Sequence, residues 1–149
     1  MTDLKAQISE YLDFLKMKYT YKDGIFELLF SERKDDRPAA PGRTAEEGYF
    51  RYTIWIRPRE KWVEVYCDVY PLANIPPDKK ADVLLDLLGC NRKYAEVCFD
   101  FDESRGMIGT SQEMMAQGLN FDEFREEFLA VPWAVKKFWS EVARKHGLK

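Results

Sequence analysis

The segment GYFRYTIWIRPREKWVEVYCDVY, residues 48–70, decides the fold of this chain. Apolar and polar side chains alternate through residues 48–57 and again through residues 62–70, which is typical of strands with one buried face. Residues 58–61, PREK, form a short polar turn between these two stretches. A turn this short joins antiparallel strands, so the sequence predicts a hairpin with one face in a hydrophobic core.

Upstream of the hairpin, the sequence predicts a helix, a turn, a strand and a loop. Apolar residues recur at helical spacing over residues 3–18, and residues 22–24, KDG, form a turn. Residues 25–32, IFELLFSE, then alternate as a strand. Residues 34–47, KDDRPAAPGRTAEE, are polar with two prolines and a glycine, and predict a mobile loop between two strands.

Downstream of the hairpin, the pattern changes to helix, two strands and a long final helix. A helix is predicted at about 78–90, a strand over 94–102, and a shorter strand over 107–111 that returns after a turn. The last helical segment covers 120–146 and contains Pro132. Proline has no N–H to donate and clashes with the preceding turn, so a kink or break is expected just before it.

This order of elements predicts an α+β fold of the form α-β-β-β-α-β-β-α. We expect a five-stranded, mainly antiparallel sheet with the N-terminal, middle and long kinked C-terminal helices packed mostly on one face. The chain has 149 residues, of which 46% are hydrophobic, enough for one domain spanning 1–149 with its own core.

Composition excludes several classes of function. The net charge is −3 and the pI is about 5.3, with no dense basic run, which argues against a nucleic-acid partner. No signal-peptide pattern opens the chain, and no apolar run approaches the roughly 18 residues of a membrane span, so no membrane partner is expected. The three cysteines, Cys67, Cys90 and Cys98, lack the spacing of a disulfide or metal framework and predict a cytoplasmic protein.

Residue types that carry catalysis are sparse. The single histidine, His146, lies near the C-terminus, where an exposed side chain is expected. Asp100, Asp102 and Glu103 offer oxygen ligands but do not fit a calcium loop, and no phosphate-loop motif occurs. The sequence therefore predicts no enzyme, metal or cofactor. The alternative is a metal-dependent enzyme or ligand sensor with a pocket between sheet and helices, using Asp68 and Asp100.

The predicted middle helix is apolar on two sides, so it needs two covering partners. One stripe consists of Ala81, Leu84, Leu85 and Leu88. A second stripe, roughly opposite, consists of Val83, Leu87 and Cys90. One side can cover the sheet, and we expect the second stripe to form a homodimer interface or to lie under the chain's other helices.

Two further groups of side chains predict a partner-binding surface. Leu129 and Trp133 fall outside the core-facing stripe of the last helix, unless the kink turns Trp133 inward. On the outer face of the sheet, aromatic residues lie among acids; they are Trp55, Trp62, Tyr66 and Tyr94, with Glu64, Asp68, Glu96 and Asp100. This combination suits a basic or amphipathic peptide, although aromatic cross-strand pairs also stabilise a sheet without binding a ligand.

A resemblance supports the same interpretation. Residues 84–115, LLDLLGCNRKYAEVCFDFDESRGMIGTSQEMM, and residues 115–139, MAQGLNFDEFREEFLAVPWAVKKFW, resemble the YbjN-type family with its type III secretion chaperone-like fold. The resemblance implies a small, acidic, cytosolic protein, often dimeric, that binds polypeptides or regulates through contacts. It carries over no catalytic residue. We therefore expect a chaperone-like or adaptor protein with a protein or peptide partner.

Overall fold

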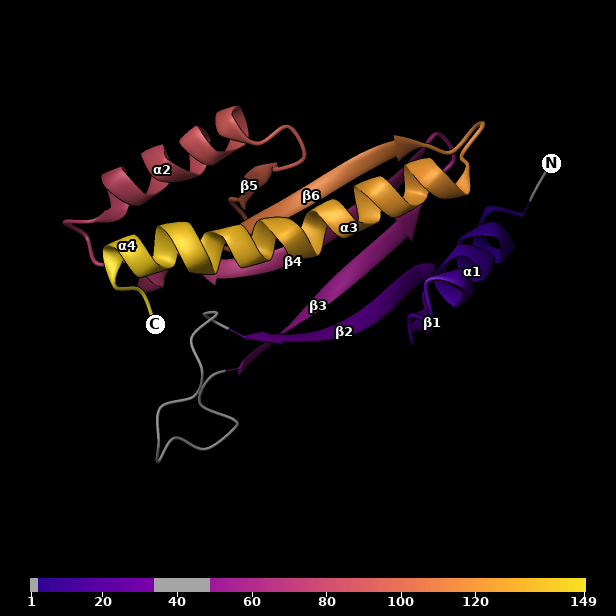
Figure 1. The fold of residues 1–149 in the computed structure, drawn as a ribbon, viewed down its shortest axis with the longest axis horizontal. Coiled ribbons are helices and arrows are strands. Elements are labelled where there is room, and N and C mark those ends of the chain that lie inside the picture. Colours follow the sequence, from indigo (N-terminus) through magenta and orange to yellow (C-terminus); the bar gives the residue numbers. More distant parts are fainter. Residues whose placement is uncertain (1–2, 34–48) are drawn as a thin grey trace.

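One antiparallel sheet with helices packed against it forms the described part of the chain (Figure 1). The computed structural model describes residues 3–33 and 49–149, so the predicted loop at 34–47 lies outside the described residues. The strands are β1 (Thr20–Lys22), β2 (Ile25–Arg33), β3 (Tyr49–Pro58), β4 (Trp62–Pro71), β5 (Phe99–Asp102) and β6 (Met107–Met115). They lie in the order β1-β2-β3-β4-β6-β5, and every neighbouring pair is antiparallel.

Three main helices accompany this sheet in the described residues. They are α1 (Leu4–Phe14), α2 (Lys80–Lys93) and α3 (Phe121–Lys137). A 3₁₀ turn η1 (Leu72–Asn74) follows β4, and α3 continues into a π-helical stretch η2 (Phe138–Ala143) and a short helix α4 (Arg144–His146). The predicted α+β class is confirmed, whereas the predicted number of strands is wrong by one: the described sheet has six, not five.

The additional strand is β1, which pairs with β2 in a tight hairpin. Its two turn residues, Asp23 and Gly24, have positive φ angles of 53° and 81°. A two-residue hairpin turn needs such angles, and Asp-Gly is among the strongest sequence signals for it. The turn was predicted but its first strand was not, because every side chain of Thr20–Lys22 is exposed and no alternation marks the strand.

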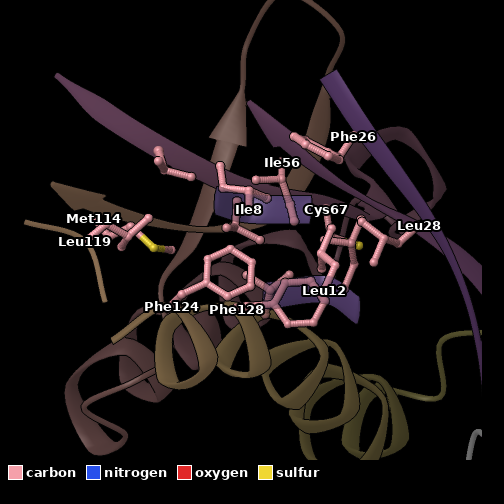
Figure 2. Close-up of a cluster of buried hydrophobic side chains, with 14 of the residues drawn as sticks. Ile8, Leu12, Phe26, Leu28, Ile56, Cys67, Met114, Leu119, Phe124 and Phe128 are labelled. Atoms are coloured by element: carbon pink, nitrogen blue, oxygen red, sulfur yellow. The ribbon is translucent and has the colours of Figure 1, made fainter. Parts of the chain in front are cut away.

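The hydrophobic core consists of two clusters that meet along α3. Figure 2 shows the first, where Ile8 and Leu12 of α1 and Phe124 and Phe128 of α3 lie against the inner face of the sheet. The strands contribute buried apolar side chains to this cluster, among them Phe26, Leu28, Ile54, Ile56, Val63, Val65, Cys67 and Met114. The second cluster joins α2, β5 and β6 to the C-terminal end of the helical segment, through residues such as Val83, Phe99, Ile108, Phe138 and Val142.

The predicted strand over 94–102 is wrong in its first half. The structure places only Phe99–Asp102 in a strand, because α2 extends to Lys93 and ends with the Tyr94 N–H donating to the Cys90 carbonyl. The Asn91 amide then donates to the Phe99 carbonyl and accepts from the Phe99 N–H, at 3.0 and 2.7 Å. This side chain covers the free edge of β5, which would otherwise offer unpaired backbone groups.

The break that the sequence allowed at Pro132 is absent. Helix α3 runs without a break from Phe121 to Lys137, and Pro132 is buried within it. The buried side chains of Phe128, Val131 and Val135 hold this part of the helix against the sheet, so tertiary packing compensates for the missing backbone donor. The change in hydrogen bonding comes later, at the π-helical stretch η2.

Candidate functional site

The outer face of the sheet, which the core-forming helices do not cover, is hollowed. Inner side chains such as Ile54 and Ile56 are fully buried, and the alternate positions of the same strands point to the other side. There, β3, β4, β5, β6 and the turn before β6 line a hollow of about 460 Å³. We call this region the outer hollow; it contains both aromatic and charged side chains.

Two stacked rings form the aromatic part of the outer hollow. Trp55 on β3 and Tyr66 on β4 are direct cross-strand partners, with ring centroids 5.4 Å apart and planes 25° apart. The Trp55 indole N–H donates to Glu27 Oε1 at 3.2 Å, and Arg57 Nη2 donates to the Tyr66 hydroxyl at 2.7 Å. Hydrogen bonds therefore fix both rings in place, and both remain half-buried in the wall of the outer hollow.

One arginine organises the charged part. Arg105, in the turn between β5 and β6, donates two hydrogen bonds of 2.8 Å to the carboxylate of Asp68. Its Nε also donates to Asp102 at 2.6 Å. Hydrogen bonds from Ser104 and from Arg105 lower the pKa of Asp102 to about 2. Two of the acids in the outer hollow are thus already paired with a cation.

Asp100 differs from these two acids. Among the described residues, its carboxylate accepts one hydrogen bond, from the Ser111 hydroxyl at 2.6 Å, and takes part in no ion pair. The residue is exposed, yet its carboxylate lies against β6, where a Cβ on Gly109 would come within 2.8 Å of Oδ1. The loss of water around the carboxylate raises the pKa of Asp100, and the negative charges of Asp68 and Asp102 add to this.

Of the four aromatic residues predicted on the outer face, three lie there and one does not. Trp55 and Tyr66 come together in the outer hollow, and Trp62 lies exposed on the same face at the start of β4, beside Met115. Tyr94 does not belong to the sheet, so its predicted place beside the other three is wrong. Tyr94 is the C-cap residue of α2, and the strand β5 begins only at Phe99.

Tyr94 instead joins a second surface, on α3. Its ring packs edge-to-face on Trp133, with centroids 5.1 Å apart, and its hydroxyl donates to Glu141. The ammonium of Lys137 lies 5.1 Å from the Trp133 ring centroid and 4.8 Å from that of Tyr94. Trp133 and Leu129 remain 37% and 39% exposed, so both predicted residues lie on the surface.

The two apolar stripes of α2 differ in burial. Val83, Leu87 and Cys90, which were expected to form a homodimer interface, are at most 6% exposed and lie in the second core cluster. Of the two options left open by the sequence, the structure shows burial within the chain. The stripe of Ala81, Leu84, Leu85 and Leu88 is the exposed one: Leu85 is 65% and Leu88 is 63% exposed.

With the Val83 and Leu87 face of α2 buried, an ion pair joins the helix to the C-terminal helix α4. Asp86 accepts from His146 Nε2 at 2.6 Å and from Lys145 Nζ at 3.1 Å. These contacts lower the pKa of Asp86 and hold one side of α2 towards α4. The side chain of His146 is only 11% exposed, so the expectation of a free histidine at the end of the chain is wrong.

The acids of the alternative, metal-dependent hypothesis lie elsewhere than that hypothesis placed them. Among residues 3–33 and 49–149, no group of three or more His, Cys, Asp or Glu side chains could hold a metal ion. Asp68 and Asp100, assigned to a pocket between sheet and helices in the alternative hypothesis, lie on the opposite face, and Arg105 binds Asp68. Within the described ranges, none of the helices has both the length and the apolar character that crossing a membrane requires.

Comparisons with known proteins identify the fold. No protein-family model and no curated protein matches the chain. YbjN from E. coli matches 96% of this chain over 93% of its own, with a TM-score of 0.59 and 14% identity. A chain of the HopA1–SchA chaperone–effector complex matches 91% of each chain, with a TM-score of 0.58 and 12% identity. A chain of the ExsC–ExsE complex matches 95% of this chain over 97% of its own, with a TM-score of 0.56 and 13% identity. The resemblance expected from the sequence is thus confirmed for the fold: the chain is built like YbjN and like these secretion chaperone–effector chains.

Proposed function

We propose that the chain is a non-enzymatic, chaperone-like or adaptor protein that binds a polypeptide segment on the outer face of its sheet. One observation carries this proposal: an ordered, solvent-accessible Trp55–Tyr66 pair lies in a hollow that no helix of the described chain covers. Half-buried aromatic residues held rigid by their neighbours lose little entropy on binding, and aromatic residues are enriched among the side chains that dominate protein interfaces. Two of the similar structures are themselves protein–protein complexes, which supports a polypeptide ligand.

The pairing of charges in the outer hollow favours recognition over proton transfer. Arg57 bonds to Tyr66, and Arg105 bonds to Asp68 and Asp102, so these groups are positioned by one another. Three free cysteines fit a reducing compartment such as the cytoplasm. A metal-dependent enzyme or ligand sensor is the rival function, and a thermal-shift screen with divalent cations and metabolites separates the two. A large, saturable shift would favour the rival.

We also propose that the chain forms a homodimer through the exposed stripe of α2. Leu84, Leu85 and Leu88 lie side by side on this helix, and all three are exposed in the part of the chain that the structure describes. Light scattering should then give about twice the monomer mass of 17.6 kDa. Leu85→Lys together with Leu88→Lys should return the monomer, whereas Leu129→Lys, a control on α3, should leave the dimer intact. A wild-type monomer at high concentration would contradict this proposal.

Selection of peptides tests the proposed binding face. A displayed library of random heptapeptides is selected against the wild-type protein, and the affinities of the selected peptides are measured by fluorescence anisotropy. Trp55→Ala should weaken binding at least tenfold, because an aromatic anchor at an interface contributes about 2 kcal/mol or more. Trp133→Ala removes the same side chain from the other predicted surface, on α3, and should leave binding unchanged if the ligand occupies the outer hollow. Equal binding by wild type and Trp55→Ala would place the ligand elsewhere.

A further inference from the structure

A continuous row of polar and aromatic side chains crosses the outer face. Asp100 on β5 bonds to Ser111 on β6; Ser111 pairs with Tyr66, Tyr66 with Trp55, and Trp55 with Glu27 on β2. The row thus spans five strands with a carboxylate at each end and two rings in the middle. Because adjacent strands are about 4.8 Å apart, the ends are about 19 Å apart, the length of roughly six extended residues.

The charge of the outer hollow is not balanced by its own residues. Two cationic side chains, Arg57 and Arg105, line it with five anionic ones, which leaves a net charge of −3. The anionic side chains are Glu64, Asp68, Asp100, Asp102 and Glu113. Arg57 and Arg105 pair with three of the five, namely Glu64, Asp68 and Asp102. A ligand that docks here would therefore remove water from uncompensated negative charge unless it supplied a cation.

Asp100 is the acid best placed to receive that cation. Ser111 donates to one of its carboxylate oxygens, Oδ2, and thereby fixes the orientation of the group. Gly109, which has no side chain to interfere, lets the other oxygen lie close to β6, at the position that pairs with Asp68 on β4. Burial of the carboxylate and the charges of Asp68 and Asp102 raise the pKa of Asp100, although the bond from Ser111 acts in the other direction.

We infer that the polypeptide bound in the outer hollow is a basic segment, with a lysine or arginine that pairs with Asp100 and an adjacent apolar side chain that packs on Trp55 and Tyr66. The inference rests on the function proposed above and adds the chemistry of the partner. A purely apolar segment would leave Asp100 unpaired, and an acidic one would meet five carboxylates. The row of side chains gives the segment its direction, across the strands.

The same heptapeptide library tests this inference against two variants. Asp100→Asn keeps the shape and can still accept the Ser111 hydrogen bond, but it removes the charge. Glu103→Gln removes a charge three residues away, from an exposed turn residue that does not line the outer hollow. Wild type and Glu103→Gln should select peptides enriched in lysine or arginine next to an apolar residue. Asp100→Asn should lose this enrichment. It should bind the peptides selected with the wild-type protein at least tenfold more weakly, and its affinity should depend less on the salt concentration.

The outcomes separate the two proposals. Peptides that require Trp55 but show no basic enrichment, or that bind Asp100→Asn as tightly as wild type, would overturn the basic partner and leave the binding face intact. Failure to select any peptide that depends on Trp55 would overturn both. Circular dichroism of each variant confirms that the fold is unchanged, so a loss of binding reports on the surface.

Discussion

The two faces of the sheet are built from alternate residues of the same strands, yet they are ordered in different ways. On the inner face, residues such as Ile54 and Ile56 are held by close packing against α1 and α3. On the outer face, Trp55 and Arg57, their direct neighbours in β3, are held by hydrogen bonds to side chains of adjacent strands. The outer face is therefore preorganised without being covered, which is the condition for binding a ligand at low entropic cost.

This difference means that the two faces have separate effects when they are altered. Removal of an inner side chain leaves a cavity in a close-packed interior and lowers the free energy of unfolding. Removal of an outer side chain leaves water in its place, so it should affect binding more than stability. The substitutions below test this separation.

The largest effect on stability is expected for Phe128→Ala. Phe128 is fully buried between the sheet and α3, and it stacks on Phe124 with centroids 5.7 Å apart. Its loss should lower the free energy of unfolding by about 3–5 kcal/mol, measured by urea denaturation. Trp55→Ala, a substitution of similar size on the outer face, should cost less than about half as much. Equal losses would mean that the outer face is part of the core after all.

An intermediate effect is expected for Gly109→Ala, where the outer face is unusually intolerant. The new Cβ would lie 2.8 Å from Asp100 Oδ1 and 3.0 Å from the Cys67 carbonyl oxygen. The carboxylate can rotate away but the backbone of β4 must shift, so the free energy of unfolding should fall by about 1–3 kcal/mol. Gly89→Ala is the control, because its Cβ would meet no atom within 4 Å. It should stabilise the protein, because alanine favours a helix.

Contacts on the outer face that depend on local pattern could be predicted from the sequence, and those between distant segments could not. The pairing of Trp55 with Tyr66 follows from alternation and from the short turn at 58–61, both of which are local. The bond between Arg105 and Asp68 joins residues 37 positions apart and depends on β4 pairing with β6, which no local pattern specifies. Arg105, Ser111 and Gly109 were therefore missed as members of the site, although Asp102 and Arg105 are spaced as a turn ion pair.

Which face of α2 is buried could not be predicted, for a similar reason. Both of its stripes are apolar, so periodicity alone cannot say which one is buried. The bond between Asp86 and His146, residues 60 positions apart, joins α2 to α4 in the orientation that buries Val83 and Leu87. In contrast, the Asp23–Gly24 hairpin was encoded locally and could have been found from its turn residues.

The smallest and most diagnostic change is expected for Asp100→Asn, on the outer face. Because the pKa of Asp100 is raised in the folded protein, the native state binds its proton more tightly than the unfolded state does. Wild-type stability should therefore fall as the pH rises from the ordinary aspartate pKa through the raised value. At pH 7, Asp100→Asn should be more stable than wild type, by less than about 1 kcal/mol because the residue is exposed to screening solvent.

Asp102→Asn is the control, because the pKa of Asp102, which pairs with Arg105, is shifted in the opposite direction to that of Asp100. Its folded pKa, about 2, is lowered, so its charge contributes stability above the unfolded pKa that is lost as the pH falls towards 2. Asp102→Asn should therefore destabilise the protein at pH 7 and approach the wild type at low pH, measured by urea denaturation across this range. Opposite shifts would show that the outer face holds one carboxylate for structure and keeps its neighbour, at some loss of stability, for a cation supplied from outside. Shifts in the same direction would contradict that division, because the two acids would then share a single structural role.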